Sequence, residues 1–407
     1  MTNRVVITGI GTISSLGIGN KALFTGMVEG RTAFSDRSFN DPERFPLLPR
    51  VLTGAIEDFS AADFLGRKGI RALNRESRVF MTAAVMACKD AGLDPSAWGH
   101  KSVGVFCGSC FAGLQDYVEM FTDGLAYGVD RVSPSQGPQT GFNSPPSQLA
   151  IHMGAEGPNL TVSNGATSSV DAIAYGSHFI REKRACAVLV GGVETLSFFA
   201  VYALASTGCL GNEPVGPRPF DLDRKGPVYA EAGVVLVLED DHQARRRGAR
   251  VLAEICGAGS AFEPDQSAPA LEQASKRAIT EALDSAGIEP DRINVIFASA
   301  NGHSVGDAAE VRALHHVFGE AVPVYAVKGV TGECLGASGA LQVAAASFCM
   351  NEQVIPATKG FVTPDPALPP LHITREHSSS NASAALVHSI DTSGHATSLV
   401  LRAPLSS

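Results

Sequence analysis

The sequence predicts an α/β fold in which buried strands alternate with helices and two similar halves follow one another. Short β-branched runs alternate along the whole chain with segments of helical periodicity, which is typical of layered α/β proteins. The second half repeats the order of the first, and the run Val103–Cys107 resembles Val295–Ser299. Hydrophobic residues are 44% of the 407 residues and charged residues 18%, so a sizeable core is expected.

The first half, residues 1–250, is expected to hold strands that are buried on both faces, because each apolar run is short and continuous. The predicted strands are Val5–Gly9, Val103–Cys107, Asn159–Val162, Ala187–Gly191 and Val234–Glu239. Apolar residues at helical spacing predict helices over Glu76–Ala91 and Ser168–Arg184. Pro and Gly concentrate in Val132–Pro146 and Gly211–Pro219, which we expect to be long functional loops.

The second half, residues 251–407, repeats the theme after a short charged helix expected in Asp240–Arg250. Its predicted strands are Arg250–Gly257, Ile293–Ala298, Ala384–Ser389 and Ser398–Arg402. Its predicted helices are Ala268–Gly287, Ala308–Val317 and Ala337–Met350. The repeated order indicates an internal duplication with its boundary near residue 250.

Charge and cysteine usage exclude several classes of function. A net charge of −9 argues against a nucleic-acid surface, and the basic run Arg245–Arg247 is expected to be a solvated helix face. No apolar run approaches the ~18 residues of a membrane span, and Met1–Gly11 resembles a strand entering a turn, not a cleavable signal. Cys107 and Cys110 are the only close cysteine pair, which is too few ligands for a zinc site. We therefore expect a cytoplasmic, reduced protein without metal or cofactor and without nucleic-acid or membrane partners.

The sharpest local signal is LTVSNGATSSVDAIAYG, Leu160–Gly176. It reads as a buried strand, an Asn-Gly turn and a helix rich in small residues. Such a turn usually exposes a nucleophile at the positive end of the helix. Here the nucleophile's position holds Ala166, which has no reactive atom.

Three further motifs resemble the β-ketoacyl synthase family. RPFDLDRKGPVYAEAGVVLVLED (Arg218–Asp240) is similar to its arginine-proline-phenylalanine-aspartate segment, and VVITGIGTISSLG (Val5–Gly17) to its first strand and loop. KGVTGECLGASGALQ (Lys328–Gln342) resembles its lysine, threonine-glycine and glycine-alanine segment. The resemblance covers essentially the whole chain. It implies the thiolase-like fold, with duplicated halves stacked as five αβαβα layers, working as a dimer.

The resemblance also implies the chemistry that this chain has lost. In the family a Cys thiolate accepts an acyl group from a carrier protein, and two His side chains stabilise the enolate formed on decarboxylation. The three matching positions here are Ala166, Asn301 and Glu333, while Lys328, the usual partner of the second His, remains. The family's flexible gate is replaced by HSIDTSGHATS, with Thr392 in place of the gating Phe.

Two interpretations of the altered residues stay open. Glu333 pairs with Lys328 as a structural salt bridge, or it serves as a base in a repurposed acyl-thioester hydrolase or acyltransferase. His303 lies two residues beyond Asn301 and enters the site if the shortened loop is redrawn. Cys334 adjoins Glu333 and is either a buried inert thiol or a group near the cavity. A third possibility is a scaffold homodimer without a tunnel.

The three coordinated losses indicate a non-condensing homologue, similar to the chain-length factors of type II polyketide synthases. The resemblance implies a heterodimer with an active ketosynthase, which would handle the acyl carrier protein while this chain shapes the acyl tunnel. The segment GSCFAGLQDYVEMF (Gly108–Phe121) matches the family's pocket floor. Phe111, Leu114, Tyr117 and Phe121 are the predicted tunnel residues, with Thr392 at the gate; ordinary interface core is the alternative for the first four.

Overall fold

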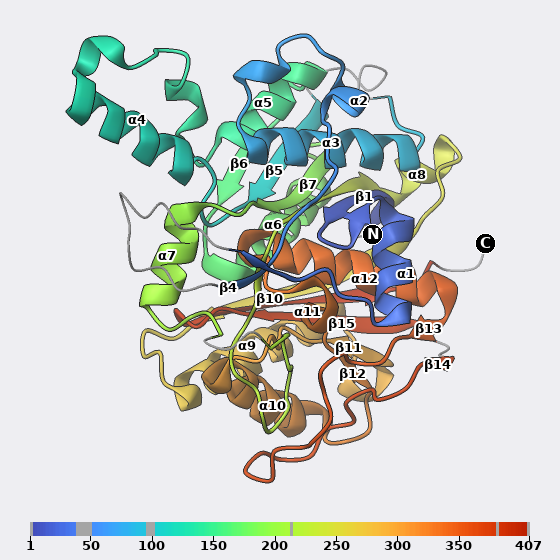
Figure 1. Ribbon diagram of the computed structural model, residues 1–407. Helices are drawn as coiled ribbons and strands as arrows, with labels where there is room; N and C mark the ends of the chain where they lie inside the picture. The colour runs from blue at the N-terminus through green and yellow to red at the C-terminus, as the bar shows by residue number, and fades with distance from the viewer. Residues whose placement is uncertain (1–2, 38–50, 95–101, 212–214, 380–381, 405–407) are drawn as a thin grey trace.

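The computed structural model describes residues 3–37, 51–94, 102–211, 215–379 and 382–404, and it confirms the layered α/β fold. Figure 1 shows five layers. Helices α3 (Arg75–Asp90) and α5 (Ser144–Met153) cover one outer face, and α9 (Ala268–Ala286) and α10 (Ser304–Phe318) cover the other. Two sheet regions come next, and helices α6 (Ser168–Arg181) and α12 (Ser338–Glu352) lie between them.

The strand order shows the internal duplication directly. The main sheet runs β12-β11-β15-β16-β10-β1-β9-β7-β5-β6, which has the same pattern when it is followed outward from β1 or from β10. In each direction two antiparallel pairings are followed by two parallel ones. The strands of the first half are β1 (Val5–Ser14), β5 (Val103–Gly108), β6 (Asn159–Val162), β7 (Ala187–Glu194) and β9 (Ala232–Asp240). Their counterparts are β10 (Ala253–Phe262), β11 (Val295–Phe297), β12 (Val324–Tyr325), β15 (Ala384–Ile390) and β16 (His395–Arg402).

The two halves meet where β1 pairs with β10 over a short antiparallel stretch, from Val5 opposite Ile255 to Ile7 opposite Ala253. Beyond it the strands diverge, and the central helices fill the space between them. Each strand carries a glycine that lets an outer helix approach: a Cβ on Gly9 would lie 2.4 Å from the Ala87 carbonyl oxygen, and one on Gly257 would lie 2.4 Å from that of Ala282.

The central layer forms the largest core cluster, which α6 and α12 share with the inner faces of both sheet regions. Helix α12 is buried on nearly all sides, and its run Ala340–Ala346 is apolar except for Gln342, whose amide donates to the His388 carbonyl at 2.7 Å. Separate clusters lie under α3 and between the second sheet region and the helices α9 and α10. Both central helices are therefore rigidly held, and with them the loops that precede their first turns.

Smaller elements complete the described chain. The helices are α1 (Asn20–Glu29), α2 (Ala62–Leu65), α4 (Leu114–Tyr127), α7 (Phe198–Ser206), α8 (Asp241–Arg246) and α11 (Lys328–Thr331). The short strands are β2 (Gly17–Ile18), β3 (Ser35–Arg37), β4 (Val51–Gly54), β8 (Tyr229–Ala230), β13 (Val354–Ile355) and β14 (Ser378–Ser379). Figure 1 shows α4 standing out from the body of the molecule. Across the described ranges, every helix is too short or too polar to cross a membrane.

The predicted strands and helices are present, with several corrected boundaries, but the expected burial of Asn159–Val162 is wrong: β6 lies at the edge of the main sheet, and only Val162 in it is buried. Strand β1 continues to Ser14 instead of stopping at Gly9, because β9 pairs with it along its whole length. Strand β10 begins at Ala253 and extends to Phe262, since β16 pairs with its second part. The expected loop Val132–Pro146 is wrong in part: Gly137–Gln139 forms a 3₁₀ turn and α5 begins at Ser144. In the expected loop Gly211–Pro219, residues 212–214 lie outside the described part of the chain.

Candidate active site

The turn before α6 has the geometry that the sequence predicts for a nucleophile. Strand β6 ends at Val162, and Gly165 adopts a φ of 65°, which favours glycine. Ala166 lies in the 3₁₀ turn Gly165–Thr167 that leads into the helix, and it is 4% exposed. The Ser168 hydroxyl accepts a hydrogen bond from the Asn164 N–H at 2.9 Å and fixes the turn. The methyl group of Ala166 offers neither a nucleophile nor a proton donor.

The Asp391 carboxylate accepts the hydrogen bond of the backbone N–H at this turn. Asp391 Oδ2 accepts a hydrogen bond from the Ala166 N–H at 2.8 Å. The other oxygen, Oδ1, accepts from the Ser393 N–H at 2.9 Å, and the Gly394 N–H donates to the Asp391 carbonyl at 3.0 Å. Asp391 is thus held in a tight turn between β15 and β16. Sequence reasoning missed this residue and concentrated on its neighbour Thr392.

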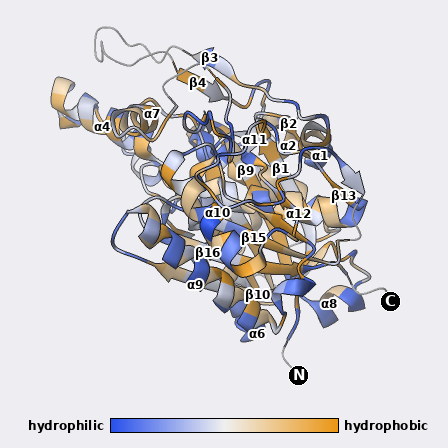
Figure 2. Ribbon diagram, turned by 90° about the horizontal axis from the view of Figure 1, so that it is seen from below, coloured by the Kyte–Doolittle hydropathy of each residue, from blue (hydrophilic) through white to orange (hydrophobic). Residues whose placement is uncertain are grey.

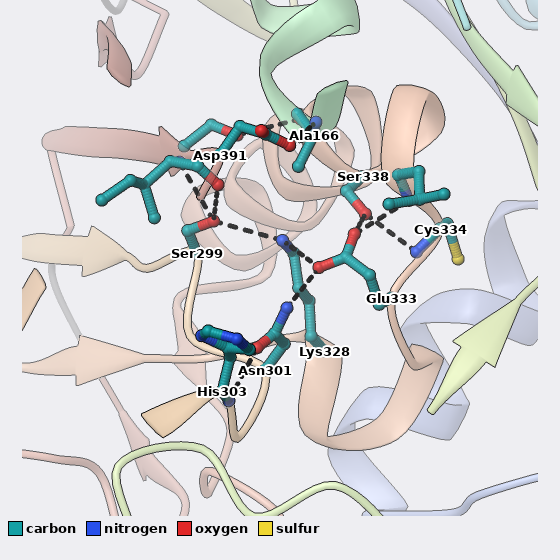
Figure 3. Close-up of polar contacts among 12 residues, drawn as sticks. Ala166, Ser299, Asn301, His303, Lys328, Glu333, Cys334, Ser338 and Asp391 are labelled. Carbon is teal, nitrogen blue, oxygen red and sulfur yellow. Dashed lines mark hydrogen bonds and ion pairs between the residues drawn. The ribbon is translucent and has the colours of Figure 1, made fainter. Parts of the chain in front are cut away.

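Glu333 is the centre of the second group of polar contacts (Figure 3). Its Oε2 accepts from Lys328 Nζ at 2.8 Å and from Asn301 Nδ2 at 2.6 Å. Its Oε1 accepts from the Leu335 N–H at 2.8 Å and from the Ser338 hydroxyl at 2.6 Å. The predicted salt bridge between Lys328 and Glu333 is therefore confirmed, and both carboxylate oxygens are fully used.

The charge pair determines the electrostatics of this group. Burial alone would raise the pKa of Glu333, but the Lys328 ammonium and three side-chain hydrogen bonds outweigh it, so that the pKa is lowered. Lys328 also donates to the Ser299 hydroxyl at 3.2 Å. A carboxylate with a lowered pKa and four donors is a poor proton acceptor, which favours the structural interpretation over a general base.

The loop that carries Asn301 is fixed from α10. Asp307 accepts hydrogen bonds from the N–H groups of Asn301 and Gly302, both at 3.1 Å, and from that of Phe220 at 2.8 Å. Burial raises the pKa of Asp307 to about 6, although the N–H donors oppose this shift. Asn301 Oδ1 in turn accepts the His303 N–H at 2.9 Å. Asn301 is thus locked in place by contacts on its backbone and on both ends of its amide.

The remaining side chains of the alternative hydrolase hypothesis are engaged elsewhere. His303 lies beside Asn301 (Figure 3), and its Nδ1 accepts the Gly306 N–H at 3.2 Å as the N-cap of α10. Burial lowers the pKa of His303, which keeps the imidazole neutral. Cys334 is completely buried, and burial raises the pKa of its thiol well above the ordinary range. This agrees with an inert thiol.

The structure connects the three altered positions through one network. Ser299 links Lys328 to the chain just before Asp391, because its hydroxyl also accepts from the Ile390 N–H at 3.1 Å. Asp391 then reaches Ala166, while Lys328 reaches Glu333 and, through it, Asn301. Ala166, Asn301 and Glu333 therefore surround one region between α6 and α11 (Figure 3).

The predicted tunnel residues follow one another from Phe111, whose carbonyl accepts the Leu114 N–H at 3.0 Å, into α4, but they differ in exposure. Phe111 packs against a small cluster that includes Val201 and Tyr229, while Leu114 begins α4 and is half-buried. Tyr117 and Phe121 are 50% and 55% exposed and stack on each other with ring centroids 6.4 Å apart. The shared face of these two residues is thus observed. The tunnel role of all four residues, and of half-buried Thr392, stays a prediction.

Comparisons with known proteins decide the family. The family model for the beta-ketoacyl synthase N-terminal domain matches residues 2–244, and the model for the C-terminal domain matches residues 252–362. The chain belongs to the β-ketoacyl synthase family. The resemblance in the motifs is therefore confirmed for the chain as a whole.

Relatives within the family include proteins named as polyketide β-ketoacyl synthases and proteins named as 3-oxoacyl-[acyl-carrier-protein] synthases. A Streptomyces halstedii protein that carries the name polyketide beta-ketoacyl synthase 1 is 33% identical over 395 residues, 92% of each chain. The 3-oxoacyl-[acyl-carrier-protein] synthase 2 of Staphylococcus aureus strain COL is 29% identical over 408 residues, 98% of each chain. Among solved structures, a chain of the ishigamide ketosynthase/chain length factor is 27% identical with a TM-score of 0.90, covering 99% of this chain and 100% of that one.

Proposed function

We propose that this chain is a non-condensing ketosynthase subunit that pairs with an active ketosynthase and shapes its acyl tunnel in polyketide or fatty-acid-like chain elongation. The observation that carries the proposal is a site without a nucleophile, in which Asp391 accepts the Ala166 N–H and the charge of Glu333 is balanced by Lys328. Ala166 replaces the nucleophile, and Glu333 is neutralised by Lys328 and fully hydrogen-bonded. The likeness to a ketosynthase/chain length factor structure supports the same role.

The exposed face of α4 supports a protein partner. Tyr117 and Phe121 on this helix, followed by Leu125, Tyr127 and Val129, are large apolar side chains with half or more of their surface exposed. Tyr202 on α7 is also exposed and stacks with Phe198, and Phe198 N–H donates to Gln115 of α4 at 3.2 Å. Large exposed apolar patches of this kind mark protein interfaces.

The two ends of the main sheet differ in a way that also favours a partner. Strand β12 is covered at its outer edge, because Val324 exchanges hydrogen bonds with His372 and Thr374 of a later segment. Strand β6, its counterpart, pairs with β5 on one edge, and no strand from the described ranges pairs with its other edge. An open edge strand is a template for pairing with another chain. Strand β6 and the nearby apolar helices are therefore the proposed interface.

Native mass spectrometry after co-expression with a related active ketosynthase tests the pairing. A one-to-one heterodimer is expected. The variant Tyr117→Asp/Phe121→Asp places charges in the apolar face and is expected to reduce the heterodimer fraction at least tenfold, because desolvating unpaired carboxylates is costly. The matched control Asp284→Asn/Glu281→Gln alters two carboxyls on α9, in the outer layer of the other half, and is expected to leave pairing unchanged.

Either of two results would contradict the proposal. One is a stable homodimer that excludes the active ketosynthase, which would favour the scaffold interpretation. The other is turnover of an acyl thioester by this chain alone that is lost in Glu333→Gln, which would favour the repurposed hydrolase or acyltransferase.

A further inference from the structure

The contact between Asp391 and Ala166 has a counterpart in the second half of the chain. Helix α12 begins with the 3₁₀ turn Leu335–Ala337, as α6 begins with Gly165–Thr167. Leu335 has a φ of 40° where Gly165 has 65°. In both turns a serine hydroxyl accepts a hydrogen bond at 2.9 Å from the N–H four residues earlier, Ser338 from Cys334 and Ser168 from Asn164.

The carboxyl groups follow the same correspondence. Gly336, the counterpart of Ala166, donates its N–H to Glu194 Oε2 at 3.2 Å. Glu194 ends β7, and Asp391 directly follows β15, the strand that corresponds to β7 in the duplicated sheet. Each carboxyl lies the same number of residues from the start of its strand. The two helices therefore begin against an acidic side chain from equivalent positions.

We propose that Asp391 is a built-in anion that occupies the donor site at the start of α6 and keeps it closed to the carbonyl oxygen of an acyl thioester. The N–H groups at a helix N-terminus attract anions, and such a donor can stabilise the charge that develops on a thioester oxygen. With Asp391 Oδ2 at 2.8 Å the Ala166 donor is already satisfied, and a second anion would meet its negative charge. The inference rests on the proposed function, since it names a residue that keeps an acyl thioester out of the site of the non-condensing subunit.

The surrounding contacts hold Asp391 in this position. Its Oδ1 is fixed by the Ser393 N–H, and its own N–H donates to the His395 carbonyl at 2.8 Å. A Cβ on Gly165 would lie 2.0 Å from Asp391 Oδ2, so the carboxylate lies directly over the turn. Among the described residues, the charge of Asp391 acts on the titratable groups of His303 and Cys110, while Glu333 and Lys328 form their own pair. The site is therefore closed by the Asp391 carboxylate as well as by the absence of a thiol at position 166.

A thiol placed in the turn reports on the Asp391 charge. We would prepare Ala166→Cys alone and combined with Asp391→Asn, and follow thiolate formation by ultraviolet absorbance as pH is raised. Each variant is referenced to the protein that keeps Ala166 but carries the same second change. A neighbouring carboxylate disfavours the thiolate and raises the pKa of the thiol, and a charge at close range typically shifts a pKa by about 1–3. The acid ionisation constant of the introduced thiol is therefore expected to rise at least about tenfold when Asp391 becomes Asn.

Two further variants complete the experiment. Ala166→Cys/Asp391→Gly removes the whole side chain at position 391, frees the backbone N–H at position 166 and is expected to increase the ionisation constant at least as much. Ala166→Cys/Asp284→Asn removes an exposed carboxyl on α9 and is expected to match Ala166→Cys. Ionisation constants within threefold of one another in Ala166→Cys and both Asp391 variants would overturn the inference. The titration uses this chain alone, so a failure to form a heterodimer does not affect it.

Discussion

Replacing Glu333 by Gln is expected to destabilise the protein by about 3–5 kcal/mol, because it leaves the buried Lys328 ammonium without its charged partner. The close contact and the deep burial of the pair favour a loss this large. Lys328 is 1% and Glu333 5% exposed, and the Nζ to Oε2 distance is 2.8 Å. The other hydrogen-bond partner of Lys328 in the structure is the neutral Ser299 hydroxyl at 3.2 Å, which cannot balance the ammonium charge.

Urea unfolding followed by far-ultraviolet circular dichroism measures this loss. The matched variants are Lys328→Met and the double variant Lys328→Met/Glu333→Gln, which removes both charges. The double variant is expected to be about 2–3 kcal/mol more stable than the sum of the two single effects predicts, because neither charge is left unpaired. A Glu333→Gln variant whose free energy of unfolding lies within about 1 kcal/mol of the original protein, with additive effects in the double variant, would show that the ion pair does not stabilise the fold. Glu333 would then be a carboxylate free to act as a base.

The remaining predictions concern activity, pH and tunnel length. Ala166→Cys alone is expected to give no condensation in a decarboxylative assay with malonyl and acyl thioesters, because Asn301 and Glu333 cannot replace two imidazoles; robust product formation would contradict this. Burial raises the pKa of Glu310 from 4.5 to about 8, so its folding contribution is present at low pH and lost as pH rises through about 8. The stability of Glu310→Gln relative to the original protein should therefore rise as pH increases from 4.5 to about 8. A difference in the free energy of chemical unfolding that stays constant over this pH range would contradict the raised pKa. In a reconstituted pair, Phe111→Ala is expected to lengthen the products and Leu114→Trp to shorten them, as mass spectrometry would show; unchanged lengths would place both residues in ordinary core.

Much of the fold follows from local patterns in the sequence. The ranges of the strands β6 and β11 and of the helices α9 and α12 agree closely with the predicted ones, because the spacing of apolar residues distinguishes strands from helices locally. The duplication also has a local signal, since Gly9-x-Gly11 in β1 and Gly257-x-Gly259 in β10 occupy equivalent positions. The pairing that extends β1 to Ser14 involves β9, more than 200 residues away, and no local pattern contains it.

The sequence identifies which residues lie at the candidate site, but not all of the contacts that they make there. The motifs identify Ala166, Asn301 and Glu333, and the spacing of Lys328 and Glu333 favours their pairing. The role of Asp391 was not predictable, because its partner lies in another half of the chain and depends on how β15 meets α6. The exposure of Tyr117 and Phe121 likewise depends on α4 standing away from the body, which helical spacing does not determine. Figure 2 shows apolar residues in the central layers and also on the projecting α4.

The location of the acyl group in the assembled pair shows which of the two subunits carries the nucleophile. The co-expressed heterodimer would be incubated with an acyl-carrier thioester, and the intact mass of each subunit would be measured after denaturation. We predict an acyl adduct on the partner ketosynthase and an unchanged mass for this chain. A covalent acyl adduct on this chain would contradict the account, and the labelled peptide would identify a nucleophile other than position 166.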